Sequence, residues 1–206
     1  MDINIFIKGF IIGISIAAPV GPIGVLCIQR TLSGGKSQGL ATGLGAASAD
    51  AVYGVVAAFG LTVISNFFIS QDTWFRLIGG AFLVYLGVKA FMASPGRLNQ
   101  AENNTRLISA YGSTFLLTLA NPMTILSFAA IFAGLGLVNN NLNYGSAVLM
   151  VLGVFGGSAV WWLFLSSSAS LFRNRIGDKL VWLNRISGTI ISTFGIIAIL
   201  SLWYTR

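Results

Sequence analysis

The sequence contains no histidine, and among its 206 residues cysteine occurs only once, at Cys27. Zinc sites are usually built from clusters of cysteine and histidine, and a disulfide bond needs two cysteines. The chain can therefore form neither a Cys/His metal site nor an internal disulfide. The serines from Ser166 to Ser168 likewise have no histidine to activate them as nucleophiles. We predict no metal, no cofactor and no enzymatic activity, and we expect Cys27 to be a small apolar residue of a helix.

Charge is also scarce, since charged residues make up 8% of the chain and hydrophobic residues 55%. A typical soluble domain has about 25% charged residues. The mean hydropathy is +0.84, and several uncharged runs exceed the roughly 18 residues that indicate a transmembrane helix. We therefore predict an all-α membrane protein whose helices form a bundle in the lipid bilayer.

Six transmembrane spans are predicted, at residues 4–29, 38–66, 73–93, 107–138, 144–172 and 185–204. A polar stretch at 94–106 separates repeat 1, at about 1–93, from repeat 2, at about 107–206, within a single membrane domain of residues 1–206. Three alignments between the halves, at shifts of 103, 108 and 109 residues, place Pro19 on Pro122 and Asp50 on Ser158. Because each repeat has an odd number of spans, the second copy is expected to enter the membrane inverted, giving a 3+3 inverted repeat as in many secondary transporters.

The basic residues indicate orientation rather than nucleic-acid binding. Twelve lysines and arginines outnumber five acids, but they are scattered between apolar runs and form no dense basic face, so no nucleic acid is predicted as a partner. Nine of them follow the first, third and fifth spans, against three on the other side: Arg30, Lys36, Lys89, Arg97, Arg106, Arg173, Arg175, Lys179 and Arg185, against Lys8, Arg76 and Arg206. The positive-inside rule then puts those loops in the cytoplasm and both termini in the periplasm.

The first span carries helix breakers near its middle, in the stretch "AAPVGPIG". It contains Pro19, Gly21, Pro22 and Gly24. A proline cannot donate to the carbonyl four residues earlier, and its ring clashes there, so this helix is predicted to break. Open backbone at membrane depth is tolerated only where it is buried in protein or lines a wet cavity. Such a break therefore predicts a binding site.

The broken ends suggest which groups the site would bind. Free amides of Ile23, Gly24 and Val25 would form the positive end of the second half-helix, which favours a carboxylate. The carbonyls of Ser15 and Ala18, at the end of the preceding half-helix, would favour an ammonium. A free amino acid carries both groups close together, so a small zwitterion is the predicted substrate.

The fourth span contains a matching stretch, "LANPMT". Asn121 is a candidate N-cap, and Pro122 would occupy the first position of a second half-helix. The amides of Met123 and Thr124 would then be free to bind substrate. A simpler alternative remains, in which the prolines of both spans only bend helices for packing.

Asp50 is the only acid between the outermost turns of any predicted span. An unpaired carboxylate at membrane depth is costly, so Asp50 should face the protein interior and either pair or take up a proton. Burial favours the neutral form, which would allow Asp50 to load and release a proton in each transport cycle. The alternative is a neutral Asp50 that only makes a hydrogen bond to a nearby serine or tyrosine.

Small residues and tryptophans complete the pattern. Gly153, Gly156 and Gly157 in the fifth span predict close helix packing. Trp161 and Trp162 of the same span are either buried or part of a pocket.

The motifs "APVGPIG", "GLGAASAD" and "NPMT" together resemble those of the LysE/RhtB family of amino acid exporters. The likeness covers nearly the whole chain and marks Pro19, Gly21, Pro22, Asp50, Asn121 and Pro122. Met123 differs from the basic residue that many relatives carry after Asn-Pro. The resemblance implies proton-driven efflux of an amino acid or derivative by a homodimer in a bacterial inner membrane.

Two other functions remain open. A divalent-cation exporter of the same superfamily would need several carboxylates or soft ligands, and a single Asp is few. A membrane scaffold without transport activity would tolerate loss of the Asp50 charge.

Overall fold

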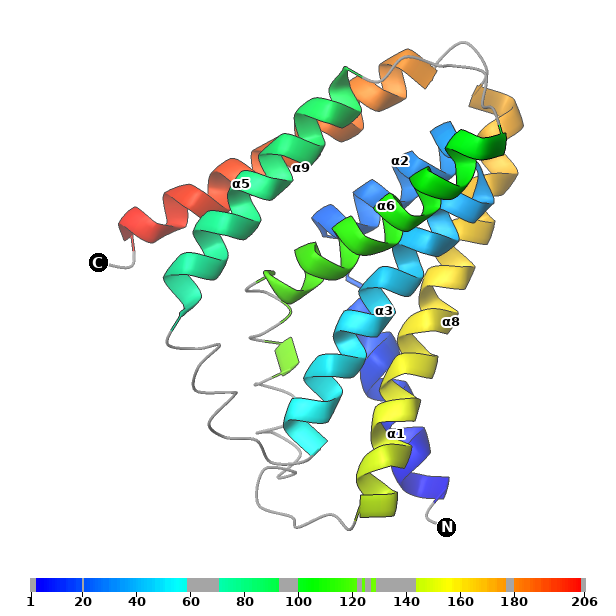
Figure 1. Ribbon diagram of the computed structural model, residues 1–206, viewed down its shortest axis with the longest axis vertical. Coiled ribbons are helices and arrows are strands. Elements are labelled where there is room, and N and C mark those ends of the chain that lie inside the picture. Colours follow the sequence, from blue (N-terminus) through cyan, green and yellow to red (C-terminus); the bar gives the residue numbers. More distant parts are fainter. Residues whose placement is uncertain are drawn as a thin grey trace.

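The computed structural model describes residues 3–19, 21–58, 71–92, 100–121, 124, 127–128, 144–176 and 180–204. All regular structure within these ranges is helical, which confirms the predicted all-α class for this part of the chain (Figure 1). The helices are α1 (Ile3–Ala17), α2 (Pro22–Gly34), α3 (Lys36–Ala58), α5 (Asp72–Phe91), α6 (Gln100–Leu119), α8 (Tyr144–Ile176) and α9 (Leu180–Tyr204).

Several of these helices are suited to cross a membrane. Helices α3, α5, α8 and α9 are long and apolar enough, and α1 and α2, bent by 80° at their junction, give a fifth span if they are counted as one. The chain is therefore a multi-pass membrane protein. Residues 59–66 and most of 122–138, which belong to two predicted spans, lie outside the described residues. The exact six-span arrangement stays a prediction.

The polar segment between the halves is partly helical. Helix α6 begins at Gln100, inside the polar stretch 94–106 that separates the two predicted repeats. Residues 93–99 lie outside the described residues. The fourth predicted span therefore starts within a longer helix than its apolar run indicates.

The helices pack in pairs that run through the whole bundle. Helix α1 packs along α8, and α5 packs along α9, while α3 contacts both α6 and α8. Helix α2 lies against α3, α8 and α9. In Figure 1, α2, α5 and α8 end toward the top of the view, whereas α1 and α8 begin at the opposite end.

Glycines allow two of these pairs to approach backbone to backbone. In the α1·α8 pair, a Cβ atom at Gly9 would collide with the Met150 carbonyl, and one at Gly157 would collide with the Phe10 carbonyl. Gly153 also meets the backbone of α1. The close packing predicted from the glycines of the fifth span is confirmed.

The α5·α9 pair uses glycines reciprocally. A Cβ atom at Gly80 would press on the Gly195 carbonyl, and one at Gly195 would press on the Gly80 carbonyl. Gly87 and Gly188 make the same two-way contact further along the helices. Each of the two helices therefore contributes glycines to their contact.

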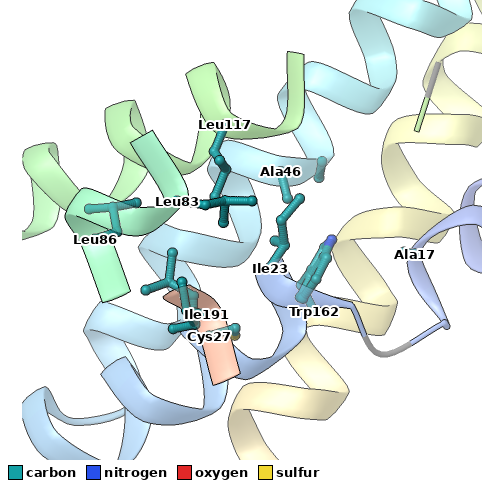
Figure 2. Packing of buried hydrophobic residues seen from close by; sticks show 11 residues of the cluster. Ala17, Ile23, Cys27, Ala46, Leu83, Leu86, Leu117, Trp162 and Ile191 are labelled. Carbon is teal, nitrogen blue, oxygen red and sulfur yellow. The ribbon is translucent and has the colours of Figure 1, made fainter. Parts of the chain in front are cut away.

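A buried apolar cluster joins all seven helices of the described residues (Figure 2). Its members are Ala17, Ile23, Leu26, Cys27, Ala46, Ala47, Leu83, Leu86, Leu117, Trp162 and Ile191. Cys27 lies in α2, as predicted for a helix residue, and is fully buried there, with its thiol donating to the Gly39 carbonyl at 3.5 Å. Figure 2 shows Trp162 beside Ile23 at the start of α2. The core thus surrounds the junction between α1 and α2.

Arg30 is part of this interior, although its position after the first predicted span placed it among the loop residues. It lies in α2, and its Nη1 donates to the hydroxyls of Thr42 and Thr114 at 3.2 and 2.9 Å and to the Ala110 carbonyl at 3.0 Å. Its Nη2 donates to the Ser113 hydroxyl at 2.8 Å. The guanidinium therefore connects α2 to α3 and α6.

Candidate functional site

The first span breaks where its prolines predict. Helix α1 ends before Pro19, and α2 begins at Pro22 after a turn in which the Gly21 amide donates to the Pro19 carbonyl at 2.9 Å. The Ser15 carbonyl would bond to the amide of residue 19 in a continuous helix, but proline has none. Pro19 therefore interrupts the helical hydrogen bonds at this point whatever its neighbours are.

The start of α2 leaves fewer amides free than expected. Within the described residues no side chain caps this helix. The Val25 amide donates to the Gly21 carbonyl at 3.1 Å, so Val25 is not one of the free donors. Ile23 and Gly24 remain in the first turn, whose amides have no acceptor inside the helix. The positive end of α2 is thus formed by these two residues.

The end of α6 forms a second polar corner. The Asn121 side-chain amide donates to the Thr124 hydroxyl at 3.0 Å, and the Thr124 backbone amide donates to the Asn121 carbonyl at 3.1 Å. The Thr124 amide is therefore occupied, contrary to the expectation that it is free. Pro122 and Met123 lie outside the described residues, and the predicted break at Pro122 stays a prediction.

A small cavity of about 60 Å³ brings most of the predicted site residues together. Its lining includes Pro19, Gly21, Pro22, Gly24, Asp50, Asn121 and Thr124. Ser15 and Ala18 line neither this cavity nor the larger one described below, and the Ser15 side chain is exposed. A buried site of this volume holds a few water molecules at most.

Asp50 is the charged group of the small cavity and is only 3% exposed. The Ser158 hydroxyl donates to Asp50 Oδ2 at 2.6 Å, and Trp162 Nε1 donates to the Ser158 oxygen at 3.1 Å. A hydroxyl has one hydrogen, so Ser158 accepts a hydrogen bond from Trp162 and uses its own hydrogen to donate to the Asp50 carboxyl group. Within the described part of the chain Asp50 makes no other hydrogen bond. The serine partner of the simpler alternative is thus present, and the proton role stays a prediction.

Three residues of this site were not predicted as members. Thr118 lines the cavity, and its hydroxyl is buried without a hydrogen-bond partner among the described residues. Trp162 is both a member of the buried cluster and part of the cavity lining, so both alternatives given for that tryptophan hold. Ser158 had a signal in the sequence, because it aligns with Asp50 at the shift of 108 residues.

A larger cavity of about 660 Å³ adjoins the same break. Pro19, Gly21 and Pro22 belong to both linings, and α5 and α9 supply the facing wall. Its volume falls within the range of about 300–1,000 Å³ that is usual for small-molecule sites. The broken backbone therefore lines both a water-sized cavity and a ligand-sized one.

Arg76 is placed differently from the sequence-based expectation. It was counted among the basic residues on the periplasmic side, but it lines the larger cavity and donates to the Ser201 hydroxyl at 3.1 Å. A position near the end of an apolar run does not show which way the side chain turns.

The chain is similar in sequence to known membrane proteins over most of its length. The sequence family described as LysE type translocator matches residues 14–202. The chain is 28% identical over 197 residues to the "Putative amino acid efflux protein YcgF" of Bacillus subtilis, covering 93% of each chain. It is 30% identical over 178 residues to the "Uncharacterized membrane protein YahN" of Escherichia coli, covering 82% of this chain and 77% of that one. It is 24% identical over 183 residues to the "Chemotactic transduction protein ChpE" of Pseudomonas aeruginosa, covering 84% of this chain and 89% of that protein. No solved structure matches the chain.

Proposed function

This chain belongs to the family of LysE type translocators, and on that premise we propose that it is a secondary transporter that exports an amino acid or amino acid derivative from the cytoplasm by proton antiport. The observation that carries the proposal is the pair of unequal cavities that share the broken backbone between α1 and α2. The relative whose printed name describes amino acid efflux covers nearly the full length of this chain, which supports the same substrate class.

The larger cavity is the compartment for the cargo. It offers the volume of a small-molecule site, and the polar corner of Asn121 and Thr124 belongs to its lining. The first turn of α2 adds Ile23, whose amide has no acceptor inside the helix. A ligand held here contacts the broken backbone directly.

The small cavity is the compartment for the proton. Asp50 is buried beside it, and the Thr118 hydroxyl supplies a second polar group that a water molecule could bridge. The Ser158 hydrogen bond occupies Asp50 Oδ2, so the other carboxyl oxygen takes up and releases the proton.

Coupling follows from the shared wall. Pro19, Gly21 and Pro22 line both compartments, and this segment is not held by a continuous ladder of helical hydrogen bonds. A displacement of the segment by cargo changes the surroundings of Asp50 at the same time. Proton release and cargo binding are thereby linked through one piece of backbone.

Helix contacts support the 3+3 inverted repeat as part of the proposal. A shift of 108 residues converts the Gly80·Gly195 contact into the Gly188·Gly87 contact, and the same shift relates Asp50 to its partner Ser158. For the third spans these contacts favour a shift of 108 residues over the shift of 109. Likewise, exchange of the halves turns the α1·α8 pair into the α6·α3 pair, and both occur.

The other functions have less support from the site. A divalent-cation exporter needs several hard oxygen ligands, and among the described residues Asp50 is the only acid that lines either cavity. A scaffold needs no cavity of ligand size. Neither alternative explains why a buried acid and a ligand-sized cavity meet at the same break.

The replacement Asp50→Asn tests the proposal. Asparagine can still accept the hydrogen bond from Ser158 but cannot exchange a proton, so we expect normal folding and at least a tenfold loss of efflux driven by an imposed pH gradient. Cells loaded with dipeptides, with and without the protein, would first identify the exported amino acids. Proteoliposomes containing that amino acid would then measure the gradient-driven rate.

Exchange of labelled for unlabelled amino acid, without a gradient, is the matched control. It should persist in Asp50→Asn because cargo binding does not need the proton. Full retention of gradient-driven efflux in the variant would contradict proton antiport, and absence of amino acid efflux from cells with the wild-type chain would contradict the function itself.

A further inference from the structure

The small cavity contains a buried hydroxyl that no described residue satisfies. Thr118 of α6 lines this cavity and is only 2% exposed, and its hydroxyl oxygen has no hydrogen-bond partner among the described residues. A threonine in a helix commonly donates to the carbonyl four residues earlier, as Thr114 of the same helix does to Ala110. A buried polar group without a partner is costly. The Thr118 hydroxyl therefore indicates that the cavity holds a ligand.

Asp50 adds a negative charge that its neighbours do not balance. Within the described residues the carboxyl group receives a single hydrogen bond, from the Ser158 hydroxyl at 2.6 Å. A carboxylate has about four lone-pair sites, so an ionised Asp50 has too few donors around it. Burying such a group is costly unless it takes up a proton or pairs with a cation. The cavity therefore favours a positively charged ligand.

The helix ends at this cavity favour a cation as well. Helices α1 and α6 end at Ala17 and Leu119, and Ala17 and Thr118 line the cavity. The Ala17 carbonyl lacks its usual helical partner, because the Gly21 amide donates to the Pro19 carbonyl instead. Helix C-termini carry partial negative charge, and the carbonyls of interrupted helices coordinate Na⁺ in several transporters. Two negative ends thus meet one positive end, that of α2.

The set of oxygen atoms suits a monovalent cation. The described lining offers one carboxyl group, that of Asp50, and the hydroxyls of Thr118 and Thr124. Divalent cations usually need several carboxylates, and the described residues contain no group of three or more acids, cysteines or histidines that could hold a metal ion. The volume of about 60 Å³ has room for one small ion and a few water molecules.

We propose that the small cavity binds one Na⁺ ion through the Asp50 carboxylate and the Thr118 hydroxyl, at the broken end of α1. This site goes beyond the proposed function, which assigns only a proton to the cavity. The ion and the proton are alternative occupants, since either one neutralises Asp50. The site also departs from the sequence-based expectation of no metal, which concerned Cys/His clusters and divalent ions.

Thermal unfolding of the purified full chain in detergent tests the site. The salt is NaCl, KCl or choline chloride, at one alkaline pH and constant ionic strength. A ligand that binds only the folded protein raises its unfolding temperature. We expect saturating NaCl to raise the unfolding temperature of the wild-type protein by at least about 3 °C over choline chloride, and KCl to raise it less than half as much.

Variants of the two ligands locate the effect. Thr118→Val keeps the shape of the side chain without the hydroxyl, and Asp50→Asn removes the charge, so both should lose most of the sodium-dependent shift. Thr118→Ser retains a hydroxyl and should keep most of it. Thr193→Val, the same change at an exposed position of α9, is the matched control and should respond to NaCl like the wild type.

The outcomes separate this inference from the proposed function. Equal unfolding temperatures of the wild-type protein in the three salts would overturn the sodium site, as would a sodium-dependent shift that persists in Asp50→Asn. If Thr118→Val does not fold, these two measurements still decide. Proton-driven efflux of amino acids from sodium-free proteoliposomes is measured separately. Its absence beside an intact sodium-dependent shift would overturn the export function and leave the sodium site standing.

Discussion

Arg30 shows how a charged residue can hold the bundle together. Its guanidinium donates to four groups on α3 and α6, an arrangement that depends on the planar fork of arginine. Arg30→Lys keeps the charge but cannot reach all four acceptors. Hydrogen bonds to a charged group contribute about 1.5–3 kcal/mol each, so we expect Arg30→Lys to lower the free energy of unfolding by about 2 kcal/mol.

Thermal unfolding of the purified protein in detergent measures this effect. Arg173→Lys makes the same chemical change at an exposed position near the end of α8 and should leave the unfolding temperature nearly unchanged. Equal unfolding temperatures for the two variants would show that the fork of Arg30 does not stabilise the fold.

Prediction from sequence worked best for residues whose type conflicts with their surroundings. Prolines and an acid within an apolar run are conspicuous, and Pro19, Pro22 and Asp50 all line the small cavity. Thr118 and Arg76 carry no such signal, because a threonine is ordinary in a membrane helix and an arginine near a span end usually marks the headgroups. Their roles depend on which helices pack around them.

Between helices, α1 and α8 approach through glycines that leave no space for a side chain. A Cβ atom at Gly157 would collide with the Phe10 carbonyl, and overpacking of this kind costs about 1–3 kcal/mol. We therefore expect Gly157→Ala to lower the free energy of unfolding by that amount, measured by thermal or denaturant unfolding in detergent.

Gly112→Ala is the control on α6, where a Cβ atom meets nothing within 4 Å. It should leave stability unchanged or raise it by about 0.5–1 kcal/mol, because alanine favours a helix more than glycine does. A Gly157→Ala protein at least as stable as the wild type would mean that α1 and α8 can separate slightly at no cost.

Helix ends were predicted less well than helix existence, for a physical reason. Hydropathy marks the part of a helix that lies in the hydrocarbon core, whereas hydrogen bonding continues into the polar region. Helix α6 thus begins at Gln100, and α8 continues to Ile176, in both cases beyond the predicted apolar run. The bend between α1 and α2 was predictable because proline acts locally.

For the molecule as a whole, the basic loops predict that both termini face the periplasm of a bacterial inner membrane. A fusion of alkaline phosphatase to Arg206 should therefore be active, and a green fluorescent protein fusion at the same place should be dark. Fusions after Arg97 should give the reverse pattern, because that residue belongs to a predicted cytoplasmic loop. A fluorescent fusion at Arg206 would contradict the orientation.

Pairing of distant helices could be predicted only in part. The internal alignments related Asp50 to Ser158, but no alignment shows that two equivalent residues touch, as the Ser158 hydroxyl and Asp50 do. The ligand-sized cavity facing α5 and α9 had no counterpart in the sequence at all, because it arises from how two helix pairs meet. The homodimer implied by the family resemblance stays a prediction.

The contact between Asp50 and Ser158 also limits how alike the two halves of this chain can become. An ancestor with the acid in both copies would have placed two carboxyl groups next to each other at this contact, where they must share one proton and cannot both ionise. With Ser158 as the partner of Asp50, no second acid at this contact shares the proton, and the carboxyl group can change charge. Divergence at this one pair of positions would thus have turned a shared proton into one that can leave.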